Sequence, residues 1–384
     1  MKPRILLVDD EPNILDSYGR ILGRQFHLFT ALSGEAGLKL IDEQGPFAVI
    51  ISDFNMPRMD GIRFLSLARE KAPETVRMML TGEGDFQIAI KAVNEGSVFR
   101  FLTKPCSQPD LLRALEAGVE QYRLIQAEKE ARRQEIRIAG EIQQTLLFET
   151  PPTQIHGAQI ACFTQASAGV DGDFLDFFVH DNTCFDLILG DVMGKGIPAA
   201  LVGAGTKNRF SRVLAQLLRN LGEAALPEPE AVMTRVQSEA GNHLASLGRF
   251  VTLCYARFNT QTRTMSFVDA GHPPALWSTP QGAVQLKGEG FPLGFPESRD
   301  YQQTTVSFEP DDVFVFYSDG LMDGRDANGA FFGIERLQEL IHGLRSEPAH
   351  AILTSIIGTY RTFVSSDSFT DDLTCVVVKS TRTE

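Results

Sequence analysis

Short apolar runs alternate with amphipathic stretches through the first third of this 384-residue chain. The apolar runs predict five strands, at residues 5–8, 28–31, 48–52, 77–80 and 98–102. The stretches between them carry apolar residues at helical spacing, as in residues 13–22, 61–68 and 86–94. Strands that alternate with helices form a parallel sheet with crossover connections. Residues 1–120 are therefore expected to form an α/β domain, a doubly wound five-stranded parallel sheet with five helices.

Polar side chains stand at the carboxyl ends of these predicted strands: Asp9, Asp10, Asp53, Thr81 and Lys104. Ligands of open α/β sheets bind at this edge. Three carboxylates so close together would repel one another unless a cation neutralised them, so we expect a bound Mg²⁺ ion. Lys104 would add a second positive charge for an incoming phosphoryl group. A single Asp at a strand end is more often a helix cap or a turn residue, but five polar residues at one edge favour a site.

The same segment resembles the receiver domain of bacterial response regulators. The resemblance lies in the motifs LLVDDEP, SDFNMPRMDG and FLTKP and in the turn Leu80-Thr81-Gly82. It implies that Asp53 accepts a phosphoryl group from a cognate histidine kinase or phosphotransfer protein. It also implies that Asp10 and the carbonyl oxygen of Asn55 join Asp53 on Mg²⁺, with Asp9 assisting through water.

The resemblance assigns roles to three further residues of this segment. Thr81 and Lys104 would contact the phosphoryl oxygens, and Phe101 falls at the aromatic switch position of the family. A cis or kinked turn is expected at Lys104-Pro105, although Pro after a strand is common in any case.

A long helix is predicted from about residue 108 to 144, because the composition shifts to Glu, Lys, Arg, Gln and Ala without a Pro-rich break. Its apolar stripe consists of Leu115, Val119, Tyr122, Ile138, Ile142 and Leu146. The stripe thins between residues 127 and 134, so a strict heptad is not sustained. We take residues 121–150 as a helical linker with two open interpretations, a solvated spacer or a helix that pairs in a homodimer and responds to phosphorylation.

Longer strands with paired helices between them are predicted in residues 151–384. The strands are expected at residues 159–166, 174–179, 185–189, 251–258, 264–268, 313–317 and 373–379. Two helices, at residues 198–220 and 229–247, separate the third strand from the fourth. This order favours α+β layers over a second doubly wound sheet.

Acidic residues again stand at the strand ends of this second segment: Asp173, Asp191, Asp319 and the pair Asp371 and Asp372. Carboxylates without His or Cys favour Mg²⁺ or Mn²⁺ over Zn²⁺. Two such ions can activate water and bind a phosphoryl group for in-line displacement, which is phosphomonoester hydrolysis. Any one of these Asp residues alone would more often be a turn residue.

The second segment resembles the bacterial PPM-type phosphatases, relatives of protein phosphatase 2C, in the subgroup of sporulation and sigma-factor-control serine phosphatases. The motifs are EIQQTLL, DGDFLDFF, GDVMGKGIPAAL, AGHPPAL, FPLGF, FYSDGLMDGRD and DDLTCVVV. The resemblance implies an α-β-β-α sandwich. It further implies that Asp191 bridges two Mn²⁺ or Mg²⁺ ions, together with Asp173 and the Val192 carbonyl oxygen, and that Asp319 and Asp371 complete the second ion's shell.

Two positions depart from the family pattern. Asp171 replaces a usual glycine, and Met193 replaces a usual serine. Asp171 and Asp372 are expected beside the metal ligands without binding a metal themselves. His272 in the AGHPP motif marks the family, but we do not expect it to be a metal ligand.

Composition and charge disfavour several classes of binding partner and site. The net charge of −13 disfavours direct nucleic-acid binding, which depends on Lys and Arg. The five cysteines occur singly, so neither a disulfide framework nor a zinc site is indicated. No apolar run reaches the ~18 residues that span a bilayer, so a cytoplasmic protein that does not bind membranes is expected.

The two resemblances together predict a two-component response regulator in which phosphorylation of Asp53 controls a metal-dependent phosphoserine/phosphothreonine protein phosphatase. By analogy with the subgroup, the substrate would be an anti-sigma-factor antagonist. The alternative is a catalytically weak, phosphatase-like adaptor that binds a regulatory partner. Degenerate relatives of that kind normally lose metal carboxylates, whereas this chain keeps them.

Overall fold

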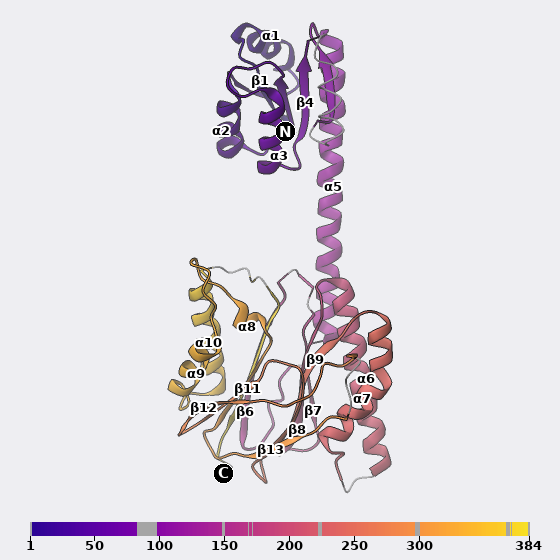
Figure 1. The fold of residues 1–384 in the computed structure, drawn as a ribbon, viewed down its shortest axis with the longest axis vertical. Helices are drawn as coiled ribbons and strands as arrows, with labels where there is room; N and C mark the ends of the chain where they lie inside the picture. Colours follow the sequence, from indigo (N-terminus) through magenta and orange to yellow (C-terminus); the bar gives the residue numbers. More distant parts are fainter. Residues whose placement is uncertain are drawn as a thin grey trace. The chain divides into compact units, whose positions relative to one another are not determined.

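The structure is a computed structural model, and it describes residues 2–82, 98–147, 150–167, 169–170, 172–221, 225–295, 300–365, 369 and 371–382. The chain divides into two compact units, Met1–Gln134 and Glu135–Glu384. Figure 1 shows the ribbon of both units. The domain limits at residues 120 and 150 stay predictions. In the described part of the chain, no helix is long and apolar enough to cross a membrane.

The first unit is a parallel sheet with the strand order β2-β1-β3-β4-β5, which confirms the predicted doubly wound fold. Its strands are β1 (Arg4–Val8), β2 (His27–Ala31), β3 (Val49–Asp53), β4 (Val76–Thr81) and β5 (Arg100–Thr103). Its helices include α1 (Pro12–Leu22), α2 (Gly34–Gln44) and α3 (Gly61–Lys71). Every residue of β3 is buried, as expected for a central strand covered on both faces. The helix predicted at residues 86–94 lies outside the described residues.

Helix α5 (Gln108–Leu147) is 40 residues long, and the division between the two units falls inside it. Leu111, Ala114, Leu115 and Val119 are buried in the core of the first unit. Residues 127–135 are all exposed, which is where the predicted apolar stripe thins. The predicted long helix is present, and its exposed middle contacts the first unit through the ion pair between Lys129 and Glu74.

The second unit is a sandwich of two antiparallel sheets, with the orders β13-β10-β9-β8-β7 and β12-β11-β14-β15-β6. The first sheet contains β7 (Phe174–Val179), β8 (Cys184–Val192), β9 (Val251–Asn259), β10 (Thr264–Ala270) and β13 (Thr304–Ser307). The second contains β6 (Ala158–Gln165), β11 (Ala275–Thr279), β12 (Gly282–Leu286), β14 (Val313–Tyr317) and β15 (Leu373–Ser380). Aromatic side chains fill the space between the sheets, including Phe185, Phe258, Phe314 and Phe316.

Helices cover the outer face of each sheet (Figure 1). Helices α6 (Ile197–Leu221) and α7 (Pro229–Ser246) pack on the first sheet. Helices α9 (Ile334–Gly343) and α10 (Ala349–Val364) pack on the second, and the short α8 (Gly320–Asp323) follows β14. The predicted α-β-β-α sandwich is confirmed, whereas β11 to β13 and α8 to α10 were not predicted.

One charged network is buried inside the first sheet of the sandwich. Asp186 on β8 is fully buried, and its two carboxylate oxygens lie 2.6 and 2.9 Å from Nε and Nη2 of Arg257 on β9. The hydroxyl of Tyr255 donates to Asp186 at 2.7 Å, and Nε2 of His180 lies 2.9 Å from it. A buried carboxylate is tolerated here because the chain supplies its own positive charge and hydrogen-bond donors.

Gly61 offers a test of the receiver packing. A Cβ at this position would overlap the carbonyl oxygen of Asp53, whereas a Cβ on Gly19 in α1 would meet nothing within 4 Å. We expect Gly61→Ala to lower the free energy of unfolding of the first unit by about 1–3 kcal/mol, and Gly19→Ala to leave it unchanged or raise it by up to about 1 kcal/mol.

The single tryptophan separates the two units in this measurement. Trp277 lies in the second unit, so its fluorescence follows that unit, while far-ultraviolet circular dichroism follows both. In urea, Gly61→Ala should move the unfolding of the first unit to a lower urea concentration. This change should appear in the circular dichroism and leave the Trp277 fluorescence transition where it is in wild type. A Gly61→Ala protein that unfolds like Gly19→Ala would contradict the close packing of α3 against β3.

Candidate metal and phosphoryl sites

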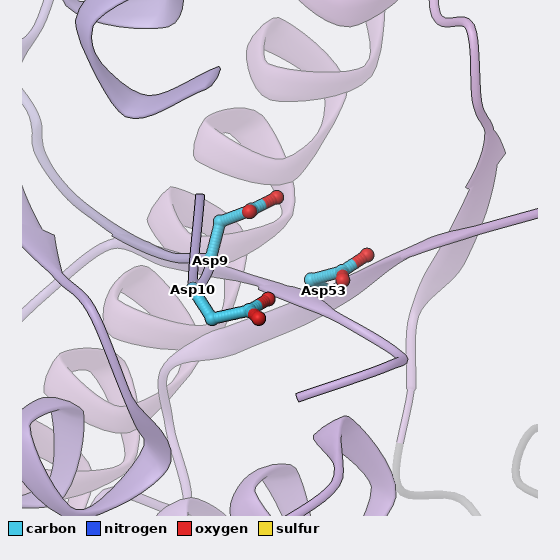
Figure 2. Close-up of side chains that lie close together, drawn as sticks. All are labelled: Asp9, Asp10 and Asp53. Atoms are coloured by element: carbon cyan, nitrogen blue, oxygen red, sulfur yellow. The ribbon is translucent and has the colours of Figure 1, made fainter. Parts of the chain in front are cut away.

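In the first unit, Lys104 bridges two buried carboxylates at the carboxyl edge of the sheet. Its Nζ atom lies 2.8 Å from Oδ2 of Asp9 and 2.7 Å from Oδ1 of Asp53. Asp10 joins them, and one oxygen atom from each of the three carboxylates lies within 4.8 Å of the others (Figure 2). The structure therefore brings the three predicted carboxylates and Lys104 into one cluster.

Backbone hydrogen bonds that extend the sheet hold these residues in place. The Asp9 N–H donates to the last carbonyl of β2 at 3.1 Å, and the Lys104 N–H donates to the carbonyl of Thr81 at 2.8 Å. Gly61 begins α3 so close to Asp53 that only a residue without a Cβ fits. The position of Asp53 is thus fixed by the start of the following helix.

The charges in this cluster do not balance. Partial burial raises the pKa of Asp53, and although the hydrogen bond from Lys104 opposes this effect, the charge of Asp9 adds to it. Burial alone would lower the pKa of Lys104, but its contacts with both carboxylates outweigh burial, so that pKa is raised. One ammonium group cannot neutralise three carboxylates, so these residues fit a divalent cation with oxygen ligands.

The other predicted receiver residues differ in burial. Thr81 is buried at the end of β4, and its hydroxyl donates to the Gly82 carbonyl at 3.3 Å. Phe101 is half-buried on β5 and packs against the core below α2 and α3, while Asn55 is exposed after β3. The Lys104-Pro105 peptide bond is cis. The roles assigned to Asn55, Thr81 and Phe101 stay predictions.

In the second unit, four acidic residues lie at strand ends of both sheets. Asp173 precedes β7 and Asp191 lies near the end of β8, while Asp319 follows β14 and Asp371 precedes β15. Asp173 is buried, Asp191 and Asp371 are half-buried and Asp319 is exposed. Within the described ranges, only the receiver carboxylates form a group of three within 4.8 Å, so these four span a wider site. A wider site is compatible with two cations about 3.5–4 Å apart.

Two Asp residues on β8 show why this site fits cations. The guanidinium of Arg257 and the ring of His180 hold the pKa of Asp186 below its ordinary range, although burial acts to raise it. Five residues further on, burial raises the pKa of Asp191 to about 8, and nearby charges add to the shift. Those charges belong to Asp173, Asp319, Asp371 and Asp372. Asp191 is therefore surrounded by like charge, which a bound cation would compensate.

Asp173 and Asp372 are held by hydroxyl and amide donors. The hydroxyl of Thr374 donates to Oδ2 of Asp173 at 2.6 Å. Oδ1 of Asp372 accepts from the amide and the hydroxyl of Ser167, at 2.8 and 2.9 Å, and its Oδ2 accepts from the amide of Gly172 at 2.8 Å. Asp372 thus anchors the loop that leads to Asp173. Asp171 in the same loop lies outside the described residues.

Gly172 lies directly against the two candidate ligands on β8. A Cβ added to it would lie 3.2 Å from Oδ1 of Asp191 and 3.2 Å from the carbonyl oxygen of Val192. The Val192 N–H in turn donates to the Gly172 carbonyl at 3.3 Å. The carboxylate of Asp191 and the carbonyl of Val192 therefore face the same small space, as the two ligands predicted there would.

Lys195 and Thr374 touch the candidate ligands but were not predicted. Nζ of Lys195 lies 2.8 Å from Oδ1 of Asp371, and Thr374 is the donor to Asp173. Both residues belong to motifs that the sequence does show, GDVMGKG and DDLT. A polar side chain in the same motif as a candidate Asp ligand was the signal that could have identified both residues.

His272 follows β10 and reaches the Asp191 strand through Thr252 on β9, which lies between the two strands. Burial lowers the pKa of His272 to about 3, so the ring is neutral. Its Nδ1 lies 3.1 Å from the hydroxyl of Thr252, which also contacts the carbonyl of Asp191 at 3.4 Å. This geometry agrees with a structural position for the AGHPP motif.

Comparisons with known proteins assign both units. Residues 5–116 match the model "Response regulator receiver domain", and residues 181–381 match the model "Stage II sporulation protein E (SpoIIE)". Phosphoserine phosphatase RsbU of Bacillus subtilis (strain 168) is 28% identical over 255 residues, which cover 64% of this chain and 70% of RsbU. Phosphoserine phosphatase RsbP of the same strain is 29% identical over 199 residues, 50% of this chain and 46% of RsbP.

A solved structure gives the same fold for the second unit. The SiaA-PP2C domain of Pseudomonas aeruginosa is 18% identical, with a TM-score of 0.56 over 66% of this chain and 98% of that domain. The SpoIIE model covers more than half of the chain, and the receiver model covers the first sheet. This chain therefore belongs to the stage II sporulation protein E family of PPM-type phosphatases, with a receiver domain preceding the phosphatase domain in the chain.

Proposed function

We propose that this protein is a response regulator in which phosphorylation of Asp53 controls a metal-dependent phosphoserine/phosphothreonine protein phosphatase. The observation that carries the proposal is the group of four carboxylates around Asp191, whose like charges add to burial in raising its pKa and match a two-cation site. The substrate we propose is a phosphorylated anti-sigma-factor antagonist. Support for a phosphoprotein substrate comes from the relatives named phosphoserine phosphatases.

The chain's own residues have distinct tasks in the proposed phosphatase reaction. Asp173, Asp191, Asp319, Asp371 and the Val192 carbonyl would hold two Mn²⁺ or Mg²⁺ ions. When bound, such ions supply positive charge that activates water and neutralises phosphoryl oxygens. Thr374 fixes the orientation of Asp173 through a 2.6 Å hydrogen bond.

The receiver site would work by a different reaction. An oxygen atom of Asp53 would form a bond to phosphorus as the phosphorus–nitrogen bond of a phosphohistidine donor breaks. Lys104 lies 2.7 Å from Asp53, so its ammonium is already placed to contact the incoming phosphoryl oxygens. Asp9 and Asp10 would hold the Mg²⁺ ion.

Helix α5 would connect the two reactions, either as a spacer or as a pairing helix of a homodimer. An adaptor without catalysis remains the alternative function. No feature of an adaptor requires four carboxylates and a matched set of donors around them, so the enzyme is the better-supported proposal. The net charge of −13 disfavours a direct nucleic-acid partner.

Replacing the proposed bridging ligand tests the phosphatase. Asp191→Asn should lower the Mn²⁺-dependent hydrolysis of p-nitrophenyl phosphate by more than about 100-fold, beyond the 10–100-fold typical of residues that only support a ligand. Glu339→Gln, an exposed substitution on α9, is the matched control and should leave the rate unchanged. EDTA should abolish the activity of both active proteins. Equal rates in wild type and Asp191→Asn would remove the enzyme proposal.

Replacing the proposed phosphoacceptor tests the control of the enzyme. Asp53→Asn should keep the p-nitrophenyl phosphate rate of the untreated protein but lose any change in rate on adding beryllofluoride, because that mimic binds the acceptor carboxylate. Light scattering on the same samples checks whether beryllofluoride changes the oligomeric state. An Asp53→Asn protein that still responds would show that control does not pass through this residue.

The raised pKa of Asp191 predicts how stability depends on pH without metal. Between about pH 4 and pH 8 the unfolded chain has released this proton while the folded protein retains it, so the free energy of unfolding falls as pH rises, by at most about 1.4 kcal/mol per pH unit. The Asp191→Asn protein has no carboxyl group at this position, so its free energy of unfolding does not fall with pH for this reason.

Thermal unfolding in EDTA measures the effect. The melting temperature of Asp191→Asn should exceed that of wild type at pH 8, and the difference should shrink toward pH 4. Mn²⁺ at pH 8 should raise the melting temperature of wild type more than that of Asp191→Asn. A pH-independent difference between the two proteins would contradict the raised pKa of Asp191.

A further inference from the structure

Between residues 127 and 141, helix α5 is half-buried on one face, where it meets the phosphatase sandwich. Residues 127–135 and 137–138 are exposed, whereas Ile136, Ala139 and Gly140 are half-buried. These three residues belong to the second unit, Glu135–Glu384. Their spacing of three and four places them on one side of the helix, so this side is where α5 meets the sandwich.

The contact is made by two glycines. A Cβ added to Gly140 would overlap the carbonyl oxygen of Gly169, so the helix backbone and the loop backbone lie against each other. Gly169 has a φ of +81°, which favours glycine, and a Cβ on it would lie 3.1 Å from Cγ2 of Ile136. Both partners of the contact therefore exclude a side chain, each for its own reason.

The loop on the far side of Gly169 is tied to the metal ligands. Ser167 and Gly172, which flank Gly169, together donate three hydrogen bonds to the carboxylate of Asp372. Gly172 also lies against Asp191 and Val192 and directly precedes Asp173. Of the described residues of this loop, Gly169 thus lies against α5, while Ser167 and Gly172 are bonded to the acidic residues of the site.

We propose that the Gly140–Gly169 contact sets the position of Asp173 and thereby couples helix α5 to the affinity of the phosphatase site for its metal. A shift or rotation of α5 would displace the Gly169 carbonyl, and the hydrogen bonds to Asp372 would carry the displacement to Gly172 and Asp173. Gly140 and Gly169 are positioning residues and contact neither metal nor substrate. The inference rests on the proposed function, since it needs the phosphatase site to bind a divalent cation and α5 to respond to Asp53.

The test introduces one methyl group into the full-length protein. In Gly140→Ala the new Cβ must push the Gly169 carbonyl away, and we expect the concentration of Mn²⁺ that half-saturates activity to rise by roughly 5- to 150-fold, the range of ordinary coupling between sites. The rate at saturating Mn²⁺ should stay close to that of wild type. Calorimetric titration with Mn²⁺ should show the same loss of affinity. The binding heat that wild type gives and Asp191→Asn does not give belongs to the phosphatase site.

Gly358→Ala is the matched control, because Gly358 lies inside helix α10 and a Cβ there would meet nothing within 4 Å. It makes the same change of helix propensity without a steric contact. Its Mn²⁺ affinity should equal that of wild type. Beryllofluoride should shift the Mn²⁺ affinity of wild type and Gly358→Ala, and the shift should be reduced in Gly140→Ala.

The outcomes separate this inference from the proposed function. If Gly140→Ala binds Mn²⁺ as wild type does and keeps its response to beryllofluoride, the coupling contact is wrong while the phosphatase proposal stands. The contact is likewise excluded if Gly140→Ala lowers the rate at saturating Mn²⁺ and the melting temperature without changing Mn²⁺ affinity, as a general loss of packing would. If wild type neither binds Mn²⁺ at the Asp191 site nor hydrolyses phosphate, the proposed function itself fails.

Discussion

Negative charge that the chain does not compensate is the constraint on which both sites depend. The fold forces carboxylates together at the ends of strands, in the receiver through parallel strands that end at one edge and in the sandwich through strands from two different sheets. Asp186 shows that this protein can bury an acid with its own counter-charge when the position is structural. At Asp53 and Asp191 the sequence places further acids nearby instead, and the folded chain holds them against their repulsion. Packing elsewhere has to supply the free energy for this arrangement.

The elements that could be predicted are mainly those with a clear apolar pattern in their own sequence. Strand β14 is a continuous apolar run and β3 begins with one, and both were found within one or two residues of their ends. Strand β13 reads TTVS, which has no apolar pattern, and it forms because β10 provides hydrogen-bond partners. Helix α10 was missed although its Ile352, Ile356 and Ile357 recur at helical spacing, on the face that the second sheet buries.

The same distinction applies within the sites. Each carboxylate could be found because it follows or precedes an apolar run in a recognisable motif. The contacts that orient the carboxylates could not be found in this way, because Ser167 and Asp372 are 205 positions apart and Thr374 and Asp173 are 201 apart. Such pairs form only when β6 and β15 lie side by side in the second sheet, which brings the two loops before β7 and β15 together. The ligands are therefore readable from sequence, and their orientation depends on topology.

The neighbouring residues Asp371 and Asp372 carry different tasks because their side chains contact different parts of the site. Asp371 faces outward to Lys195, while Asp372 faces inward to Ser167 and Gly172. The pair is not a duplication in which one acid could replace the other. An inserted residue between this pair and Leu373, where β15 begins, would move both carboxylates out of these contacts, so the length of this connection is constrained as strictly as its composition.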